Sequence, residues 1–145
     1  MSTSNDLFSE EMQEIWDSFI AETQELLNQL EQDLLQLENH ADDPELINKI
    51  FRAVHTIKGT SGFLNFEYMS KLAHCYEDVL NKMRRGQLAF QPPMLDVMMA
   101  VVDQMKHLLQ MAMEKNIQPV DLTPLLSQLE NIDELSTPKK KKSAS

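Results

Sequence analysis

The sequence predicts an all-α protein, an antiparallel four-helix bundle with a fifth C-terminal helix packed on it. Apolar residues recur every three to four positions along most of the chain, and no useful length alternates with the period of two that strands require. Only 3 glycines are present, whereas Leu, Glu, Gln and Met, all good helix formers, are plentiful. A length of 145 residues suits one domain with its own core.

The first two predicted helices are separated by a clear break. The first spans about residues 9–39 and carries an apolar stripe at helical spacing. The break is the segment 41–44, Ala-Asp-Asp-Pro. Asp43 is a favourable N-cap and Pro44 suits the first helical position, so we expect a second helix from Pro44 to about Phe63.

Three more helices follow from similar end signals. Asn65 is expected to cap a third helix that stops at Gly86. Pro92-Pro93 should open a fourth helix, and Thr123-Pro124 a shorter fifth. Four long amphipathic helices joined by short links predict an antiparallel bundle, with the fifth helix on its side or end.

The helical domain is expected to span residues 9–135, between a disordered N-terminus (1–8) and a flexible Lys/Ser-rich linker (136–145). The formal net charge is -10, although the linker contains four consecutive lysines. An acidic domain disfavours nucleic acid and anionic lipid as ligands, and favours partners with basic docking surfaces. The lysine run fits a solvated linker better than a nuclear or membrane address, because Pro138 and its Ser and Ala neighbours offer nothing to pack.

The expected location is the cytoplasm. Cys75 is the single cysteine, so no internal disulfide can form. Residues 1–6 lack the basic and apolar parts of a signal peptide, and the longest apolar run, 97–102, is too short to insert into a membrane. We expect a monomer, because all five inward stripes can be satisfied within one chain.

The second helix carries the candidate reactive residue. On a helical wheel, His55, Gly59 and Gly62 lie on one arc, with Phe51 and Lys58 at its edge. A separate arc is apolar and must face the core; its members are Ile47, Ile50, Val54, Ile57, Ser61 and Leu64. The imidazole of His55 is therefore expected to point outward or to lie at a rim.

The two glycines can be interpreted in two ways. A glycine inside a helix costs about 0.5–1 kcal/mol relative to alanine, so a reason for two is needed. Bare backbone beside His55 would let another macromolecule reach its outer nitrogen, which makes Phe51, Gly59 and Gly62 candidate partner-binding residues. Lys58 could then neutralise an incoming phosphoryl group. Alternatively, the glycines permit close helix packing or begin the end of the helix, and the spacing alone does not decide.

A second polar pair lies on the third helix. His74 and Glu77 are three residues apart, hence neighbours on one helical face beside the core stripe. If the second and third helices are antiparallel, this pair can face His55. A carboxylate bonded to one imidazole nitrogen would fix the tautomer and make the ring a better nucleophile, with His74 bridging or buffering the contact. The alternative is a surface pair worth little energy.

Residues 55–66, His-Thr-Ile-Lys-Gly-Thr-Ser-Gly-Phe-Leu-Asn-Phe, resemble the signature of histidine-containing phosphotransfer (HPt) domains. The similarity is greatest to the N-terminal domain of CheA-type chemotaxis histidine kinases. It extends to Phe51-Arg-Ala-Val before the histidine and to the helix order over about residues 9–134. The His74-x-x-Glu77 pair falls where that family keeps a hydrogen-bonded His and Glu beside the phosphorylation site.

The resemblance implies a phosphoryl carrier of a two-component phosphorelay. His55 would receive phosphate on Nε2 from the ATP-binding domain of a separate histidine kinase core and pass it to an aspartate of a CheY-like response regulator. Glu77 would hold Nδ1–H, and Lys58 with His74 would complete the network. ATP and Mg²⁺ would act on the kinase and the regulator, so no cofactor is expected on this chain.

Full kinases of that family continue into dimerisation, ATP-binding and coupling domains that have no counterpart in these residues. Three glycines cannot supply a Gly-rich phosphate loop, so the chain should be unable to phosphorylate itself. It is expected to be either the first domain of a larger kinase, which the Lys/Ser tail favours, or a free-standing carrier.

Two other classes compete with a carrier. A non-catalytic helical adaptor would bind partners through its acidic, methionine-rich surface. A bundle metalloprotein would need Glu-x-x-His pairs facing the core, and the four histidines have no such pair and lie outside the apolar stripes. We therefore expect no metal site.

Overall fold

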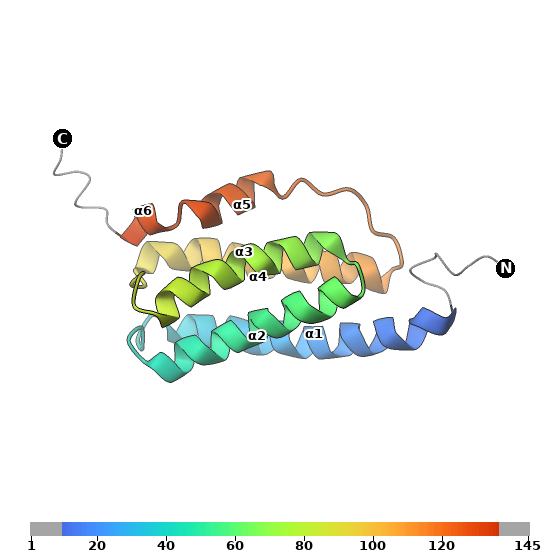
Figure 1. Cartoon of the computed structure of the whole chain (residues 1–145), viewed down its shortest axis with the longest axis horizontal. Helices are drawn as coiled ribbons and strands as arrows, with labels where there is room; N and C mark the ends of the chain where they lie inside the picture. The colour runs from blue at the N-terminus through green and yellow to red at the C-terminus, as the bar shows by residue number, and fades with distance from the viewer. Residues whose placement is uncertain (1–9, 137–145) are drawn as a thin grey trace.

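The computed structural model describes residues 10–136, and these residues form helices joined by loops and turns (Figure 1). Four long helices run alternately in opposite directions, so the predicted antiparallel four-helix bundle is confirmed. In chain order, the helices are α1 (Glu10–Gln36), α2 (Pro44–Phe63), α3 (Glu67–Arg84), α4 (Pro92–Met113), α5 (Thr123–Glu130) and α6 (Asp133–Ser136).

The fifth helix returns along the bundle and packs on α3 and α4, as expected (Figure 1). The short α6, which contacts α4, was not anticipated, because its four residues carry no periodic signal of their own. It ends at Ser136, the first residue of the expected linker. The predictions for residues 1–8 and for the rest of the linker, 137–145, fall outside the described residues.

One continuous apolar core joins the long helices. The inward arc predicted for α2 is buried throughout. Rings from α1 and from the α2–α3 turn meet at one end, where Trp16 lies 5.6 Å from Phe19 and 5.5 Å from Phe66 between ring centroids. Six methionines are buried in this core (Met69, Met83, Met94, Met98, Met105 and Met111), which removes much of the methionine surface that an adaptor would use.

The link between α2 and α3 spans residues 64–66, one residue longer than the sequence suggested, and Asn65 does not cap α3. Asn65 has φ 61°, and its N–H donates to Gly62 O at 3.1 Å, while Phe66 N–H donates to Ser61 O at 2.9 Å. These two bonds close the end of α2 in a Schellman turn. Asparagine is favoured both as an N-cap and in this left-handed conformation, so its identity alone could not distinguish the two roles.

Other end signals were correct. Asp43 accepts a bond from Glu45 N at 3.0 Å, and Pro44 begins α2. Gly86, with φ 74°, terminates α3 as predicted. The first helix stops at Gln36, three residues early, because residues 37–39 form turns. None of the helices in the described part of the chain has the length and apolar character needed to cross a membrane.

Candidate functional site

His55 projects from the middle of α2 toward α3, and 59% of its side chain remains exposed. The two helices are antiparallel neighbours, so Glu77 on α3 lies opposite it. Nδ1 of His55 is hydrogen-bonded to Oε2 of Glu77, whose side chain is only 11% exposed. With Nδ1 bonded to a carboxylate, the proton sits on Nδ1, and the outward Nε2 keeps its lone pair.

Lys58, one turn after His55, completes this contact from the other side. Its Nζ lies 2.7 Å from Oε1 of Glu77, so each oxygen of the carboxylate has its own partner. Burial alone would raise the pKa of Glu77, but the hydrogen bonds from Lys58 and His55, together with the positive charge of Lys58, outweigh it and lower that pKa. Glu77 is therefore ionised at neutral pH, and Lys58 is bound to it rather than free beside Nε2.

His74 lies outside this network. Its Nε2 is 3.9 Å from Oδ2 of Asp78, and both side chains are well exposed. This separation is too long for a hydrogen bond. The two side chains form an ion pair only when His74 is protonated. The expected bridge from His74 to Glu77 and His55 is therefore not formed. At about 100° per residue, side chains four positions apart differ by about 40° around the helix axis, and those three apart by about 60°. Asp78 is therefore better placed than Glu77 to be the neighbour of His74.

The two glycines differ in their surroundings. A Cβ added at Gly59 would meet nothing within 4 Å, so close packing between helices does not explain this glycine. A Cβ added at Gly62 would lie 3.6 Å from Ser70 Oγ, an ordinary contact, and Gly62 O accepts a bond that ends α2. Both glycines line an open groove of about 650 Å³ together with Lys58, Lys71 and His74. The backbone at Gly59, one turn after His55, thus faces open space.

Phe51 and Arg84 extend the site toward the other end of α2. The Phe51 ring stacks on the imidazole of His55, with centroids 5.8 Å apart and planes at 16°. Arg84, in the last turn of α3, places its Cζ 4.0 Å from the Phe51 centroid. Arg84 was missed in the sequence, although it lies seven residues after Glu77 and hence on the same face of α3.

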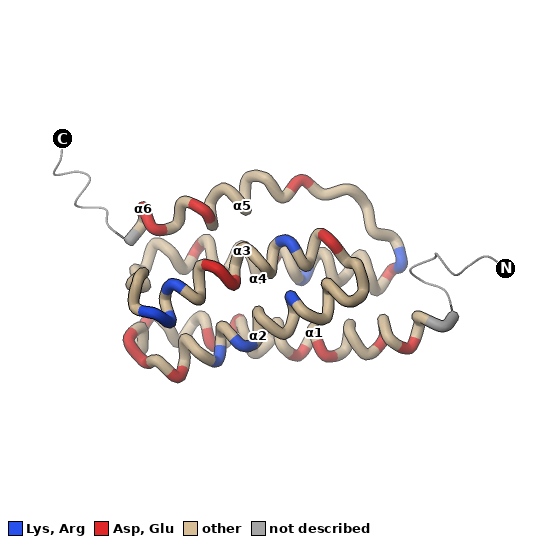
Figure 2. The backbone as a smooth tube through the Cα atoms, in the orientation of Figure 1, with Lys and Arg blue, Asp and Glu red and all other residues tan. Residues whose placement is uncertain are grey.

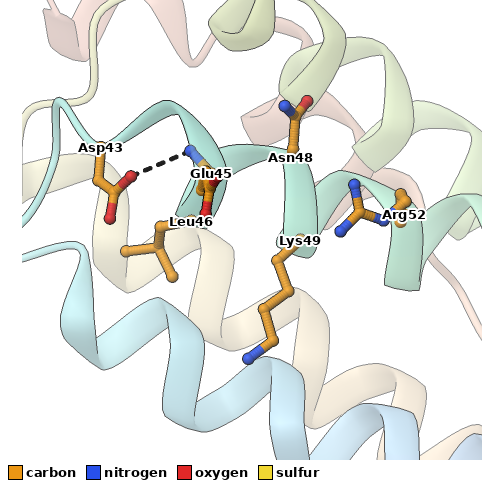
Figure 3. A pocket seen from close by; sticks show the side chains of 6 residues that line it. All are labelled: Asp43, Glu45, Leu46, Asn48, Lys49 and Arg52. Atoms are coloured by element: carbon orange, nitrogen blue, oxygen red, sulfur yellow. Dashed lines mark hydrogen bonds between the residues drawn. The ribbon is translucent and has the colours of Figure 1, made fainter.

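A second hollow, of about 420 Å³, lies at the start of α2 (Figure 3). Its side chains do not converge on a common point. Asp43 is occupied by the backbone of Glu45, and Lys49 extends toward α1, where it lies 3.5 Å from Asp33. Asn48 lies on the side of α3 (Figure 3). We assign no ligand to this hollow. Nor does any group of three or more His, Cys, Asp or Glu within residues 10–136 lie close enough to hold a metal ion.

Charge is divided between the helices (Figure 2). The α1 sequence contains eight acidic residues and no basic one. Residues 44–85, which form α2 and α3, contain only four acidic residues against seven basic ones: Lys49, Arg52, Lys58, Lys71, Lys82, Arg84 and Arg85. The hairpin that carries His55 is therefore net positive in an acidic chain. The expectation of basic partner surfaces, drawn from net charge, does not hold for this face.

An exposed imidazole, held in one tautomer by a carboxylate on an antiparallel helical bundle, defines a class of proteins that present one histidine for reaction. Comparison with known families agrees with this class. The Hpt domain family matches residues 14–133, which is most of the chain. The chain therefore belongs to the Hpt family, and it is homologous to the phosphotransfer domain of CheA.

Individual relatives are chemotaxis kinases. The sensor histidine kinase CheAY of Helicobacter pylori is 45% identical over 100 residues, which cover 69% of this chain and 12% of that protein. The solution structure of the histidine phosphotransfer domain of CheA matches with a TM-score of 0.74 and 32% identity, covering 83% of this chain and 92% of that one. The chain spans less than a fifth of the length of the curated relatives it matches.

A solved complex also shares the fold. The phosphorylated P1 domain of CheA3 from R. sphaeroides, in complex with CheY6, matches with a TM-score of 0.74. It is 25% identical, and the match covers 86% of this chain and 98% of that one. The bundle of this chain is thus the architecture of a phosphotransfer domain of chemotaxis two-component signalling.

Proposed function

We propose that His55 is the phosphoryl acceptor of this Hpt domain. The observation that supports this most directly is the hydrogen bond from Nδ1 to Glu77, combined with the 59% exposure of the His55 side chain. The bond leaves Nε2 as the nucleophilic atom, and the bare backbone at Gly59 leaves room for a second protein to approach it.

The proposed transfer forms one bond to phosphorus and breaks another. Nε2 of His55 attacks the γ-phosphorus of ATP held by a separate histidine kinase core; the N–P bond forms, the P–O bond breaks and ADP leaves. Positive charge develops on the ring, and the Glu77 carboxylate stabilises it while holding Nδ1–H. Lys58 fixes the carboxylate through its other oxygen and offsets its charge, which keeps Glu77 ionised.

We infer that the phosphoryl group then passes to an aspartate of a CheY-like response regulator. The solved P1–CheY6 complex supports this partner, and the CheA-type kinases among the relatives support a histidine kinase ATP-binding domain as donor. ATP and Mg²⁺ would be bound by these partners and not by this chain. The cytoplasm, where CheA-type kinases act, is the proposed location, with the domain monomeric.

The test is phosphorylation of the 145-residue chain by a CheA-type kinase core and radiolabelled ATP. We expect one acid-labile, base-stable phosphoryl group on the wild type and less than about 1% of that amount on His55→Gln, because no other imidazole has the Glu77 anchor. His107→Gln, which changes an exposed histidine on α4, is the matched control and should be labelled normally. Full labelling of His55→Gln would disprove the carrier function and leave the adaptor alternative.

A further inference from the structure

Arg84 is held in place by contacts that include no ion pair. Its Nη2 donates to Asn81 Oδ1 at 3.0 Å, and its Nη1 lies 3.5 Å from Asn48 Oδ1 on α2. The ion pairs found within residues 10–136 do not involve Arg84, although the chain is rich in carboxylates. The remaining contact of the guanidinium is with the face of Phe51, at 4.0 Å from Cζ to the centroid.

The imidazole of His55 needs a second constraint besides Glu77. The hydrogen bond at Nδ1 lies in the plane of the imidazole ring. It fixes the position of Nδ1, but it restricts tilting of the ring plane about the bond only weakly. Most of the His55 side chain is exposed, and solvent does not restrict that tilt. The Phe51 ring, nearly parallel to the imidazole at 16°, covers part of one face and opposes rocking.

Phe51 is itself only partly buried, so its ring also requires support. The cation of Arg84 over its face supplies this support, because a guanidinium is attracted to the electron-rich face of an aromatic ring. Seven residues separate Glu77 from Arg84, two turns of α3. Helix α3 thus contacts the site twice, with a carboxylate at the edge of the imidazole and a guanidinium on the aromatic ring that stacks against it.

We propose that Arg84 and Phe51 are positioning residues that set the orientation of the His55 ring for phosphoryl transfer. The proposal rests on His55 being the acceptor. It predicts that the stack acts on the intrinsic reactivity of the imidazole and does not require a partner protein. Orientation matters because the lone pair of Nε2 must point along the line of attack on phosphorus.

The experiment uses phosphoramidate, a small phosphoryl donor that reacts with histidine without a kinase. We compare Arg84→Met, Arg84→Lys and Phe51→Leu with the wild type, and Arg85→Met serves as the control because Arg85 is the exposed neighbouring arginine. Arg84→Met and Phe51→Leu should slow phosphorylation by about two- to fivefold, the factor that an exposed cation–π contact is worth. Arg84→Lys should recover part of the rate, and Arg85→Met should react like the wild type.

Two further readouts separate positioning from general stability. The ring protons of His55 should change chemical shift in Arg84→Met and Phe51→Leu, because the ring current of Phe51 moves or disappears. The double variant Arg84→Met/Phe51→Leu should be no slower than Phe51→Leu alone, since both changes act through one stack. A wild-type rate and an unchanged His55 spectrum in Arg84→Met would overturn the proposal, as would fully additive effects in the double variant.

His55→Gln distinguishes the two proposals in the same assay. If it takes up phosphate at the wild-type rate, His55 is not the acceptor and the proposed function fails. If His55→Gln is inert while the stack variants react normally, only the positioning role fails. If Arg84→Met melts well below the wild type, Arg84→Lys decides: with normal melting, a rate between those of Arg84→Met and the wild type supports the proposal, and a rate as low as that of Arg84→Met overturns it.

Discussion

The carboxylate of Glu77 has two hydrogen-bonding partners, the neutral imidazole of His55 and the cation of Lys58, and it is nearly buried. His55 and Lys58 each take one oxygen, both from α2, and their combined effect lowers the pKa of Glu77 against the opposing effect of burial. Replacing the carboxylate would therefore affect both the tautomer of His55 and the position of Lys58. The single residue links the stability of the α2–α3 contact to the chemistry at Nε2.

We predict that Glu77→Gln retains the fold but slows phosphoryl uptake roughly tenfold or more, because charge-assisted hydrogen bonds are worth about 1.5–3 kcal/mol.

The contribution of Glu77 to the free energy of unfolding has a defined pH dependence. The folded-state pKa of Glu77 is lowered, so its contribution is present above the unfolded-state pKa and is lost as the pH falls through the folded-state value. Urea unfolding should separate wild type from Glu77→Gln at neutral pH and bring them together in acid. A constant difference at all pH values would contradict this assignment.

At the scale of elements, α2 combines a buried arc with an open one, and its two glycines have separate causes. Gly59 faces open space one turn after the proposed acceptor His55, whereas Gly62 belongs to the turn that ends the helix. A side chain at Gly59 would cost the fold nothing sterically. It would instead fill the approach to His55.

We predict that Gly59→Leu is as stable as the wild type or more stable by about 0.5–1 kcal/mol, because leucine is a better helix former. Transfer to the regulator should fall roughly tenfold or more, since in-line transfer needs the reacting atoms within about 3–3.5 Å. Melting temperature and transfer rate measured on one preparation test both parts. Gln32→Leu, an exposed change on α1, is the control; an equal loss of transfer in that variant would show a nonspecific effect.

At the scale of the whole molecule, the division of charge gives the two sides of the bundle opposite signs. Helix α1 is strongly acidic, while the α2–α3 hairpin that carries His55 is net basic (Figure 2). Opposite charges on a partner would draw it toward the reactive side and away from α1. A phosphoryl-accepting aspartate surrounded by further acidic groups is the kind of surface that fits this hairpin.

We predict that the second-order rate of transfer to the regulator falls with added salt, by roughly tenfold between low and physiological ionic strength. Lys71→Gln, which removes a charge from the groove beside His55, should reduce the salt dependence. Lys115→Gln, beyond the end of α4, should leave it unchanged. A rate that rises with salt would mean that repulsion dominates the encounter.

The sequence by itself determined most of the helices, their ends and the choice of His55 as the candidate acceptor. These features follow from local signals: apolar spacing of three to four, Asp43 before Pro44, Gly86 after α3, and the run from His55 to Gly62. Each depends on residues within a few positions, so each can be predicted without knowing how the helices pack.

Only the tertiary structure decided which side chains meet across α2 and α3. The contact of Lys58 with Glu77, the approach of His74 to Asp78 and the place of Arg84 over Phe51 all depend on the rotation and offset of α3 against α2. A change of one residue in that offset would carry a side chain about 100° around the helix and 1.5 Å along it. Periodicity predicts the face of a helix, but it does not predict which group on that face reaches a given atom.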